Sequence, residues 1–375
     1  MVRIERVRLR EVRLPLREPF RISSGEVKER RILLLELEDG DGHVVWSECV
    51  AGEYPNYSPE TIDTAWHALR TWILPRVIGT SLDGPESVHA LLERDLRGHR
   101  MAKAAVEMGC WALEAERQNI ALAELLGGTK EVVLVGISLG MQATPAALVE
   151  RASAALSEGY QKIKLKIGPG NDIAYVSAVR EALGERAPLM ADANNAYELS
   201  DAAHLAKLDA FNLMMIEQPL DGEDLARHAE LQRTLRTPIC LDESITSVRR
   251  AEDMLRLGSG RIINIKPGRV GGFTESKAIH DVCAAHGLPV WCGGMLESGI
   301  GRAYNVALAS LPNFRIPGDL SPSSRYWERD IVRPEWTMDA NGTMRVPFRD
   351  GGIGVEVDRG YVEDITVRTE LASSP

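Results

Sequence analysis

Five ionisable residues recur at nearly even intervals through the middle of this sequence. Lys166, Asp192, Glu217, Asp242 and Lys266 are 24 to 26 residues apart, and each stands at the end of a short apolar segment. Three carboxylates without a histidine or thiol form an all-oxygen set of ligands, which suits a hard cation, Mg²⁺ best and Mn²⁺ second. A lysine on either side of such a cation could take or return a proton at carbon beside a carboxylate.

A divalent cation between two lysines would make it easier to remove a proton from carbon beside a carboxylate. Removing a proton beside a carboxylate gives an enediolate, and a divalent cation neutralises the charge that develops on it. The lysine that acts as base has to be uncharged, although its reference pKa is about 10.4. A like-charged neighbour lowers that pKa, and Lys164 stands two residues before Lys166. The alternative interpretation is a structural network of salt bridges between lysines and acids.

The spacing also predicts the elements that position these residues. In residues 159–168 lysine alternates with isoleucine or leucine, which predicts a strand with three lysines on one face. Apolar strands separated by helix-sized segments are typical of a closed parallel barrel, whose active-site face lies at the C-terminal strand ends. With a first strand at 131–138 and the last two at 288–292 and 314–318, the barrel has eight strands. Lys166 on the second strand and Lys266 on the sixth would face each other across its mouth.

The flanking segments have a different character. Residues 1–50 read as antiparallel strands, with a bulge near Glu11 and a hairpin turn at 39–42. Two segments, 19–25 and 52–59, are predicted as loops that could form a lid. Residues 58–128 show helical periodicity that stops at two glycines. Beyond residue 321 a tail with an Asn341-Gly342 turn is expected to fold back onto the N-terminal sheet.

Composition restricts the class of protein. The chain has 375 residues and a formal net charge of −10, which argues against nucleic-acid and anionic-membrane partners. Its five cysteines contain no Cys-x-x-Cys pair, so neither a disulfide framework nor a zinc site is indicated. No apolar run suggests a signal peptide or a membrane span. We expect a cytoplasmic homo-oligomer whose partner is a small-molecule carboxylate substrate.

Seven motifs carry a resemblance to a known family. They lie at residues 98–103, 164–167, 192–194, 216–220, 241–244, 264–272 and 291–299. Together they resemble the enolase superfamily, in its muconate-lactonising subgroup, and most closely the o-succinylbenzoate synthase and N-acylamino acid racemase family. The resemblance covers nearly the whole chain.

The resemblance implies a fold and a role for each motif. The fold would be an α/β protein with a modified (β/α)7β TIM barrel at 129–320, an N-terminal α+β capping domain at 1–128, and a tail at 321–375 that completes the capping domain. Lys166 and Lys266 would be the proton-transfer groups on opposite faces, with Lys164 tuning Lys166. The implied Mg²⁺ ligands are Asp192, Glu217 and Asp242, and the groups supporting them are Asn194, Gln218 and Glu243. The candidate pocket residues are Phe20, Tyr57, Ser138, Met295, Ser298 and Ile300.

Two reactions follow from the resemblance. The synthase dehydrates 2-succinyl-6-hydroxy-2,4-cyclohexadiene-1-carboxylate to o-succinylbenzoate for menaquinone, and the racemase exchanges the α-proton of N-acylated, including N-succinylated, amino acids. A dedicated racemase and a muconate cycloisomerase are alternatives. A dipeptide epimerase would be expected to carry Asp-x-Asp where residues 318–321 have only Asp319. Two alternative hypotheses belong to other functional classes: a Schiff-base lyase on the same barrel, and a non-catalytic metal-binding barrel.

Overall fold

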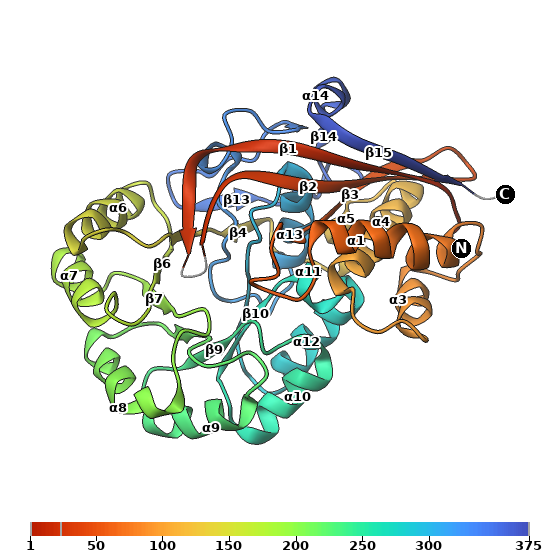
Figure 1. The fold of residues 1–375 in the computed structure, drawn as a ribbon. Helices are drawn as coiled ribbons and strands as arrows, with labels where there is room; N and C mark the ends of the chain where they lie inside the picture. The colour runs from red at the N-terminus through yellow and green to blue at the C-terminus, as the bar shows by residue number, and fades with distance from the viewer. Residues whose placement is uncertain (1, 23–24, 374–375) are drawn as a thin grey trace.

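The computed structural model describes residues 2–22 and 25–373, and its N-terminal part is built on an antiparallel sheet. This capping sheet has the strand order β15-β1-β2-β3 (Figure 1). Its strands are β1 Ile4–Ile22, β2 Gly25–Asp39, β3 Val44–Cys49 and β15 Thr366–Ser373. The register of β1 against β15 shifts between Glu11 and Val12, where the apolar alternation of the sequence also slips, so the predicted bulge is confirmed.

The prediction of a loop at residues 19–25 is wrong for residues 19–22 and 25, which belong to strands, and residues 23–24 lie outside the described part of the structure. β1 continues to Ile22 and β2 begins at Gly25, with Phe20 paired to Val27 and Ile22 paired to Gly25. In this half of the hairpin the register shifts between Pro15 and Phe20. Pro19 lies in that irregular stretch, and proline is tolerated at bulges because it has no N–H to donate to the ladder. The long hairpin bends toward the barrel at its far end (Figure 1).

Helices pack on the capping sheet where the sequence predicted them. They are α1 Ile62–Ala68, a π-helical turn at Leu69–Ile73, α2 Leu74–Val77, α3 Pro85–Glu93, α4 Arg100–Gln118 and α5 Leu122–Leu126. The long helix α4 lies against β3 and β2 and buries the predicted apolar stripe. Gly109 allows this approach, because a Cβ there would lie 2.8 Å from a methyl carbon of Leu37.

Seven parallel strands form the barrel in the order β11-β10-β9-β8-β7-β6-β5. They are β5 Gly136–Leu139, β6 Lys162–Lys166, β7 Leu189–Asp192, β8 Ile216–Glu217, β9 Ile239–Leu241, β10 Ile262–Ile265 and β11 Val290–Cys292. The helices are α6 Pro145–Ser157, α7 Ile173–Leu183, α8 Ala202–Leu205 with 3-10 turns at Leu199–Asp201 and Ala206–Phe211, α9 Leu225–Thr234, α10 Val248–Leu257, α11 Pro267–Val270, α12 Phe273–Ala285 and α13 Gly299–Ala309. Helices α6 to α10 and α12 lie outside the strands (Figure 1).

The barrel closes without a regular eighth strand. The predicted segment 314–318 forms no continuous strand. It makes two isolated β-bridges, Phe314 with Val290 and Gly318 with Val135. Pro317 lacks a backbone N–H, which explains why the ladder is not continuous. The predicted first strand is also divided. Its first part, β4 Val132–Leu134, pairs with β13 Thr343–Arg345 outside the barrel sheet, and its second part is β5.

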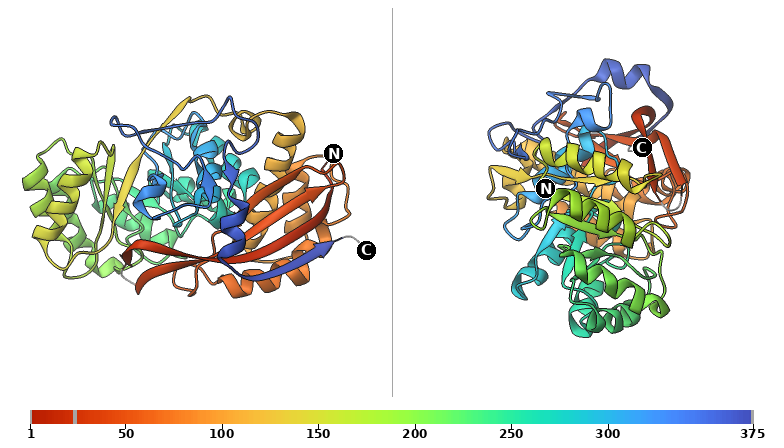
Figure 2. Two further views of the ribbon diagram at one scale, coloured as in Figure 1. Left: turned by 90° about the horizontal axis from the view of Figure 1, so that it is seen from above. Right: turned by 90° about the vertical axis from the view of Figure 1, so that its left-hand side faces the viewer.

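The C-terminal tail returns to the capping sheet through β15. Before it lie a 3-10 turn at Ser323–Arg325, the paired strands β12 Val332–Arg333 and β14 Glu356–Val357, and α14 Arg359–Asp364. The Asn341-Gly342 turn is confirmed, with the Gly342 N–H 3.0 Å from the carbonyl oxygen of Asp339. The start of β1 and the end of β15 lie at the same end of the molecule (Figure 2). Within the described ranges, no helix combines the length and apolar character needed to cross a membrane.

Candidate active site

The five evenly spaced residues meet at the C-terminal ends of neighbouring strands. Lys166, Asp192 and Glu217 are the last residues of β6, β7 and β8, and the strand register pairs Lys166 with Asp192 and Asp192 with Glu217. Asp242 and Lys266 directly follow β9 and β10. Since β6 and β10 are the second and sixth barrel strands, their lysines stand on opposite sides of the mouth.

Lys164, Lys166 and Lys266 each form an ion pair with a carboxylate. The Nζ atoms of Lys164 and Lys166 lie 3.0 Å and 2.6 Å from the same oxygen, Oδ2 of Asp192. Lys166 also donates to Oδ1 of Asn194. On the opposite side, Nζ of Lys266 lies 2.7 Å from Oδ2 of Asp242. The two candidate proton-transfer groups are thus held by different acids.

The three candidate metal ligands are almost completely buried, so their charges interact strongly. Glu217 accepts from Nζ of Lys164 at 3.0 Å and from Nδ2 of Asn264 at 2.8 Å. Burial, together with the charge of Asp192, raises the pKa of Glu217 to about 8. Burial alone would also raise the pKa of Asp242, yet the positive charges of Lys266 and Arg269 hold it well below its usual range.

Tyr57 and Arg269 complete the surroundings of Asp242. The Tyr57 hydroxyl donates to Oδ1 of Asp242 at 2.7 Å, and the Arg269 guanidinium pairs with the same oxygen. Nζ of Lys266 lies 4.4 Å from the centre of the Tyr57 ring. Sequence reasoning gave Arg269 no role, although it lies in the motif at 264–272, three residues after Lys266.

A second layer of charge lies deeper in the barrel. Lys162, fully buried, places Nζ 3.3 Å from the centre of the Trp291 ring and 3.1 Å from Oδ1 of Asp319. The other oxygen of Asp319 lies 3.1 Å from Nζ of Lys164. One carboxylate therefore contacts two lysines of β6. The alternation of β6 placed Lys162 on the same face as Lys164, but nothing local in the sequence pointed to Asp319 as their partner.

The predicted supporting residues lie next to the candidate ligands. Oδ1 of Asn194 accepts from Lys166 and its Nδ2 donates to Oε1 of Glu243 at 3.2 Å. Oε1 of Gln218 accepts from the backbone N–H of Asp242 at 2.9 Å. Asn194 and Gln218 have φ values of 43° and 39°, a left-handed conformation that non-glycine residues keep only when their surroundings hold them. Both are thus fixed at the ends of their strands.

The acidic set fits a hard cation. Asp192, Glu217 and Asp242 are buried, lie on adjacent strands and offer only oxygen, and beside them Oε2 of Glu243 and Oδ1 of Asn264 are buried without a hydrogen-bond partner among the described residues. Asp192 and Glu217 share Lys164, whereas Asp242 is turned toward Lys266 and Arg269. Among the described residues, the ligand atoms of the group Asp39, Asp41 and His43 lie within 4.8 Å of one another, whereas those of the three barrel carboxylates are farther apart. That group forms the β2–β3 hairpin turn, where Oδ1 of Asp39 accepts from the backbone N–H groups of Asp41 and His43.

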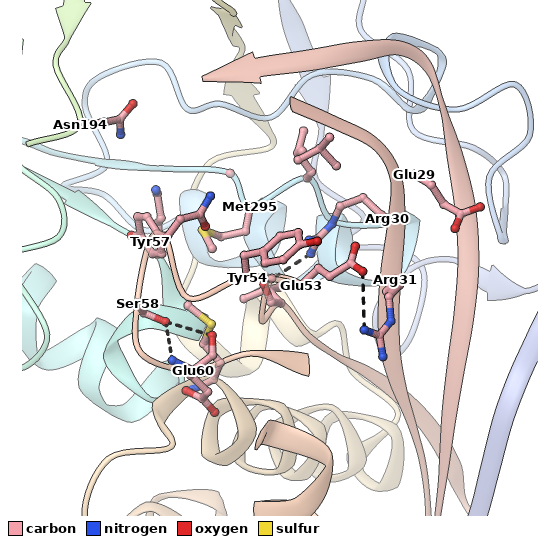
Figure 3. Close-up of a pocket in the computed structure, with 18 of the residues that line it drawn as sticks. Glu29, Arg30, Arg31, Glu53, Tyr54, Tyr57, Ser58, Glu60, Asn194 and Met295 are labelled. Carbon is pink, nitrogen blue, oxygen red and sulfur yellow. Dashed lines mark hydrogen bonds and ion pairs between the residues drawn. The ribbon is translucent and has the colours of Figure 1, made fainter. Parts of the chain in front are cut away.

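A cavity of about 460 Å³ lies between the capping domain and the barrel mouth (Figure 3). Lys166, Lys266 and Asn194 line it from the barrel. Of the predicted pocket residues, Tyr57 and Met295 line it as well. Both lysines therefore reach the same cavity.

Three other predicted pocket residues lie outside the cavity wall. Ser138 is buried within β5, paired in register with Lys164. Ser298 precedes α13 and donates from Oγ to Oε2 of Glu48 at 2.6 Å, and Ile300 is fully buried in that helix. Met295 and Leu296 line the cavity, and the helix begins three residues later at Gly299. Phe20 belongs to β1, but its side chain lies outside the described part of the structure.

Comparison with family models agrees with the two-part architecture. The model described as "Mandelate racemase / muconate lactonizing enzyme, N-terminal domain" matches residues 4–127. The model described as "Enolase C-terminal domain-like" matches residues 147–361.

Individual proteins match over nearly their whole length. An o-succinylbenzoate synthase from Geobacillus kaustophilus is 48% identical, covering 99% of this chain and 98% of its own. An N-succinylamino acid racemase from Amycolatopsis is 46% identical over 97% and 98% of the two chains. A solved enolase-superfamily structure from Listeria innocua has a TM-score of 0.96 at 39% identity, covering 100% of both chains. A muconate lactonizing enzyme from Pseudomonas fluorescens has a TM-score of 0.90 at 24% identity over 97% and 99% of the chains, a likeness of fold alone.

Proposed function

The chain belongs to the enolase superfamily, in its family of o-succinylbenzoate synthases and N-succinylamino acid racemases, and on that premise we propose that Lys166 and Lys266 move the proton at carbon beside a carboxylate. The protein is an enzyme, a carbon–oxygen lyase, an amino acid racemase, or both. One observation carries the assignment of the two lysines: they come from opposite strands and line the same cavity.

This placement accounts for both reactions. In racemisation, Nζ of one lysine takes the α-proton from one face of the substrate, and Nζ of the other lysine returns a proton to the opposite face. In the dehydration, one lysine takes the proton from the carbon beside the carboxylate and returns a proton to the departing hydroxyl, which leaves as water as the C–O bond breaks, while the ammonium of the other lysine offers positive charge. The capping domain contributes Tyr57 and Arg30 to the wall of the cavity in which the reacting carbon would lie.

Members of this superfamily depend on a divalent metal, and we assign Asp192, Glu217 and Asp242 as the residues that would hold it, with Mg²⁺ as the cation. When bound, the cation would supply positive charge against the enediolate. The chain contributes the rest: Gln218 and Tyr57 orient Asp242, and Asn194 and Asp192 hold Lys166. Asp319 balances the charge of Lys164, the residue to which we assign the tuning of Lys166.

We propose o-succinylbenzoate synthase as the main activity, for menaquinone biosynthesis, with N-succinylamino acid racemisation beside it. The experiment supplies the Mg²⁺-loaded enzyme separately with the cyclohexadiene substrate and with N-succinylamino acids of both configurations. A larger kcat/KM for dehydration supports the synthase. A kcat/KM for racemisation that equals or exceeds it supports the dedicated racemase, the second candidate that the 46% identity to the Amycolatopsis enzyme favours.

The remaining alternatives lose support from particular observations. Asp319, the one aspartate of the 318–321 segment, is committed to Lys162 and Lys164, which argues against a dipeptide epimerase. A Schiff-base lyase would be trapped by borohydride in the presence of a carbonyl substrate and would keep its activity without metal. We further propose that the enzyme works in the cytoplasm as a homo-oligomer.

A further inference from the structure

A buried arginine in the cavity wall has no acidic partner among the side chains that the structure describes. Arg30 of β2 lines the same cavity as Lys166 and Lys266, and it is only 7% exposed. Its one hydrogen bond is a long one, 3.5 Å from Nη2 to the carbonyl oxygen of Val50, and its buried Nε has no partner. Burial lowers the pKa of Arg30, but a guanidinium stays charged in proteins. Among residues whose side chains are described, Arg30 forms no ion pair.

The neighbouring cations of β2 differ from it. Arg31, the next residue, has acidic partners: Nε lies 2.8 Å from Oε1 of Glu11, and Nη2 lies 3.0 Å from Oδ1 of Asp63. Lys28 is exposed to solvent. The Arg30 side chain points from its strand toward Tyr54 (Figure 3). Of these three cations in the wall, Arg30 is therefore the one that combines burial with unused donors.

The two acids whose charges act most strongly on Arg30, Glu48 and Glu297, already have other hydrogen-bond partners. Oε2 of Glu48 accepts from Oγ of Ser298 at 2.6 Å and from the backbone N–H of Gly301 at 3.1 Å. Glu297 accepts from Nδ2 of Asn305 at 2.7 Å and pairs with Arg302 at 3.3 Å. Burial also raises the pKa of Glu48 to about 8, which leaves this carboxyl largely neutral at neutral pH. A buried charge without a partner is unfavourable, so the site is suited to an anion that enters from the cavity.

We propose that Arg30 binds the carboxylate at the far end of the substrate's succinyl group. This inference rests on the proposed function, because the cyclohexadiene substrate and the N-succinylamino acids share a succinyl group. In both, its terminal carboxylate is separate from the carboxylate beside the reacting carbon. The planar fork of a guanidinium matches a carboxylate with two parallel hydrogen bonds. A single anchor would thus serve both reactions, and Tyr54 and Met295 provide apolar surface for the methylene groups.

The test compares two substrates that differ by one charge. N-Succinylamino acid is paired with its succinamoyl analogue, in which a neutral amide replaces the terminal carboxylate. The wild-type enzyme should prefer the succinyl substrate by roughly 10- to 100-fold in kcat/KM, the range of a hydrogen bond to a charged group. Arg30→Met keeps the apolar stem and should reduce that preference to within about threefold of unity. The change should lie mainly in KM, because the anchor is remote from the reacting carbon.

Lys28→Met is the matched control, since Lys28 is an exposed cation of the same wall. The preference should survive in this variant. The proposal is overturned if Lys28→Met removes the preference and Arg30→Met does not, if Arg30→Met lowers kcat/KM equally for both substrates, or if the wild-type enzyme does not discriminate. Arg30→Lys keeps the charge without the fork and should retain part of the preference. If Arg30→Met does not fold, Arg30→Lys is used in its place.

A binding measurement separates this inference from the proposed function. Calorimetry with o-succinylbenzoate and its succinamide analogue needs no turnover. If the wild-type enzyme is active but binds both ligands equally, the proposed role of Arg30 is contradicted and the proposed function is not. Absence of both dehydration and racemisation contradicts the proposed function. In that case a preference for o-succinylbenzoate that Arg30→Met removes would still support the anion site.

Discussion

The hydroxyl of Tyr57 donates a hydrogen bond of 2.7 Å to Oδ1 of Asp242. Tyr57 comes from the segment between β3 and α1, whereas Asp242 stands at the end of β9. Burial, with the charge of Asp242, keeps the pKa of the phenol above its usual range, so Tyr57 remains a donor. The capping domain therefore contacts a candidate metal ligand directly.

Tyr57→Phe tests this contact. The ring over Lys266 is kept and only the hydroxyl is lost, so kcat/KM for dehydration and racemisation should fall by roughly 10-fold or more, the range of a hydrogen bond to a charged acceptor. Steady-state kinetics at saturating Mg²⁺ provide the measurement. Tyr54→Phe is the control, because Tyr54 lines the same cavity but is 71% exposed. Equal effects of the two changes would contradict a specific role for the Tyr57 hydroxyl.

Replacing either proton-transfer lysine should abolish catalysis without unfolding the protein. Lys166→Ala and Lys266→Ala should each reduce racemisation by about 10² to 10⁴, the usual contribution of a general acid or base. Exchange of the α-proton for deuterium in D₂O, followed by NMR for each enantiomer, measures the loss. Circular dichroism checks the fold. A double variant that still exchanges the proton would rule out the mechanism.

Removing the metal should remove activity reversibly. Treatment with a chelator should abolish turnover, and Mg²⁺, or Mn²⁺ less effectively, should restore it. Asp192→Asn should raise the Mg²⁺ concentration needed for half-maximal activity by about tenfold or more. Asp41→Asn, in the acidic group of the β2–β3 hairpin, is the control and should leave this concentration unchanged. A larger effect of Asp41→Asn would place the required metal at the hairpin.

The buried carboxyl of Glu48 predicts a pH dependence of stability. Its pKa is raised to about 8, mainly by burial, so between pH 4.5 and 8 the unfolded chain loses a proton that the folded protein keeps. Stability from this group is greatest below the unfolded pKa and declines as the pH rises toward 8. Glu48→Gln, which imitates the neutral acid, should remove the decline, which is of the order of a few kcal/mol.

Thermal unfolding from pH 5 to pH 8 measures this difference. The midpoint of the wild-type protein should fall relative to that of Glu48→Gln as the pH rises. Glu86→Gln, at an exposed acid of α3, should follow the wild-type curve. Parallel curves for the wild type and Glu48→Gln would show that Glu48 titrates alike in the folded and unfolded protein.

Local sequence signals were enough to predict β6 to β11 and where the five ionisable residues stand, whereas the predicted first strand is divided and the predicted eighth is not a regular strand. The alternation within β6 and the apolar segment before each ionisable residue are patterns of residues adjacent in sequence. The structure places each of these residues at its expected strand end. The partners of these residues could not be predicted in this way. Asp319 lies more than 150 residues from Lys162 and Lys164, and no periodicity connects them. Arg30 had no pattern that separated it from other strand arginines.

Errors in the interpretation occurred where tertiary contacts outweigh local preference. Proline and serine near residue 20 indicated a loop, but pairing with β2 extends β1 through that region. Ser298 follows the motif at the end of β11, which suggested a pocket residue. A buried acid on β3, Glu48, instead draws it into the contact between the two domains. Such contacts bring together segments 250 residues apart.

The pairing of β1 with β15 has a consequence for how the protein is made. Leu9 pairs with Glu370, so a ribosome produces the whole barrel between these two partners. At 5–20 residues per second, one edge of β1 waits roughly 20 to 70 s for its neighbour. An unpaired strand edge invites association with other chains during that interval. The nascent protein therefore depends on rapid barrel formation, or on a chaperone, until translation reaches β15.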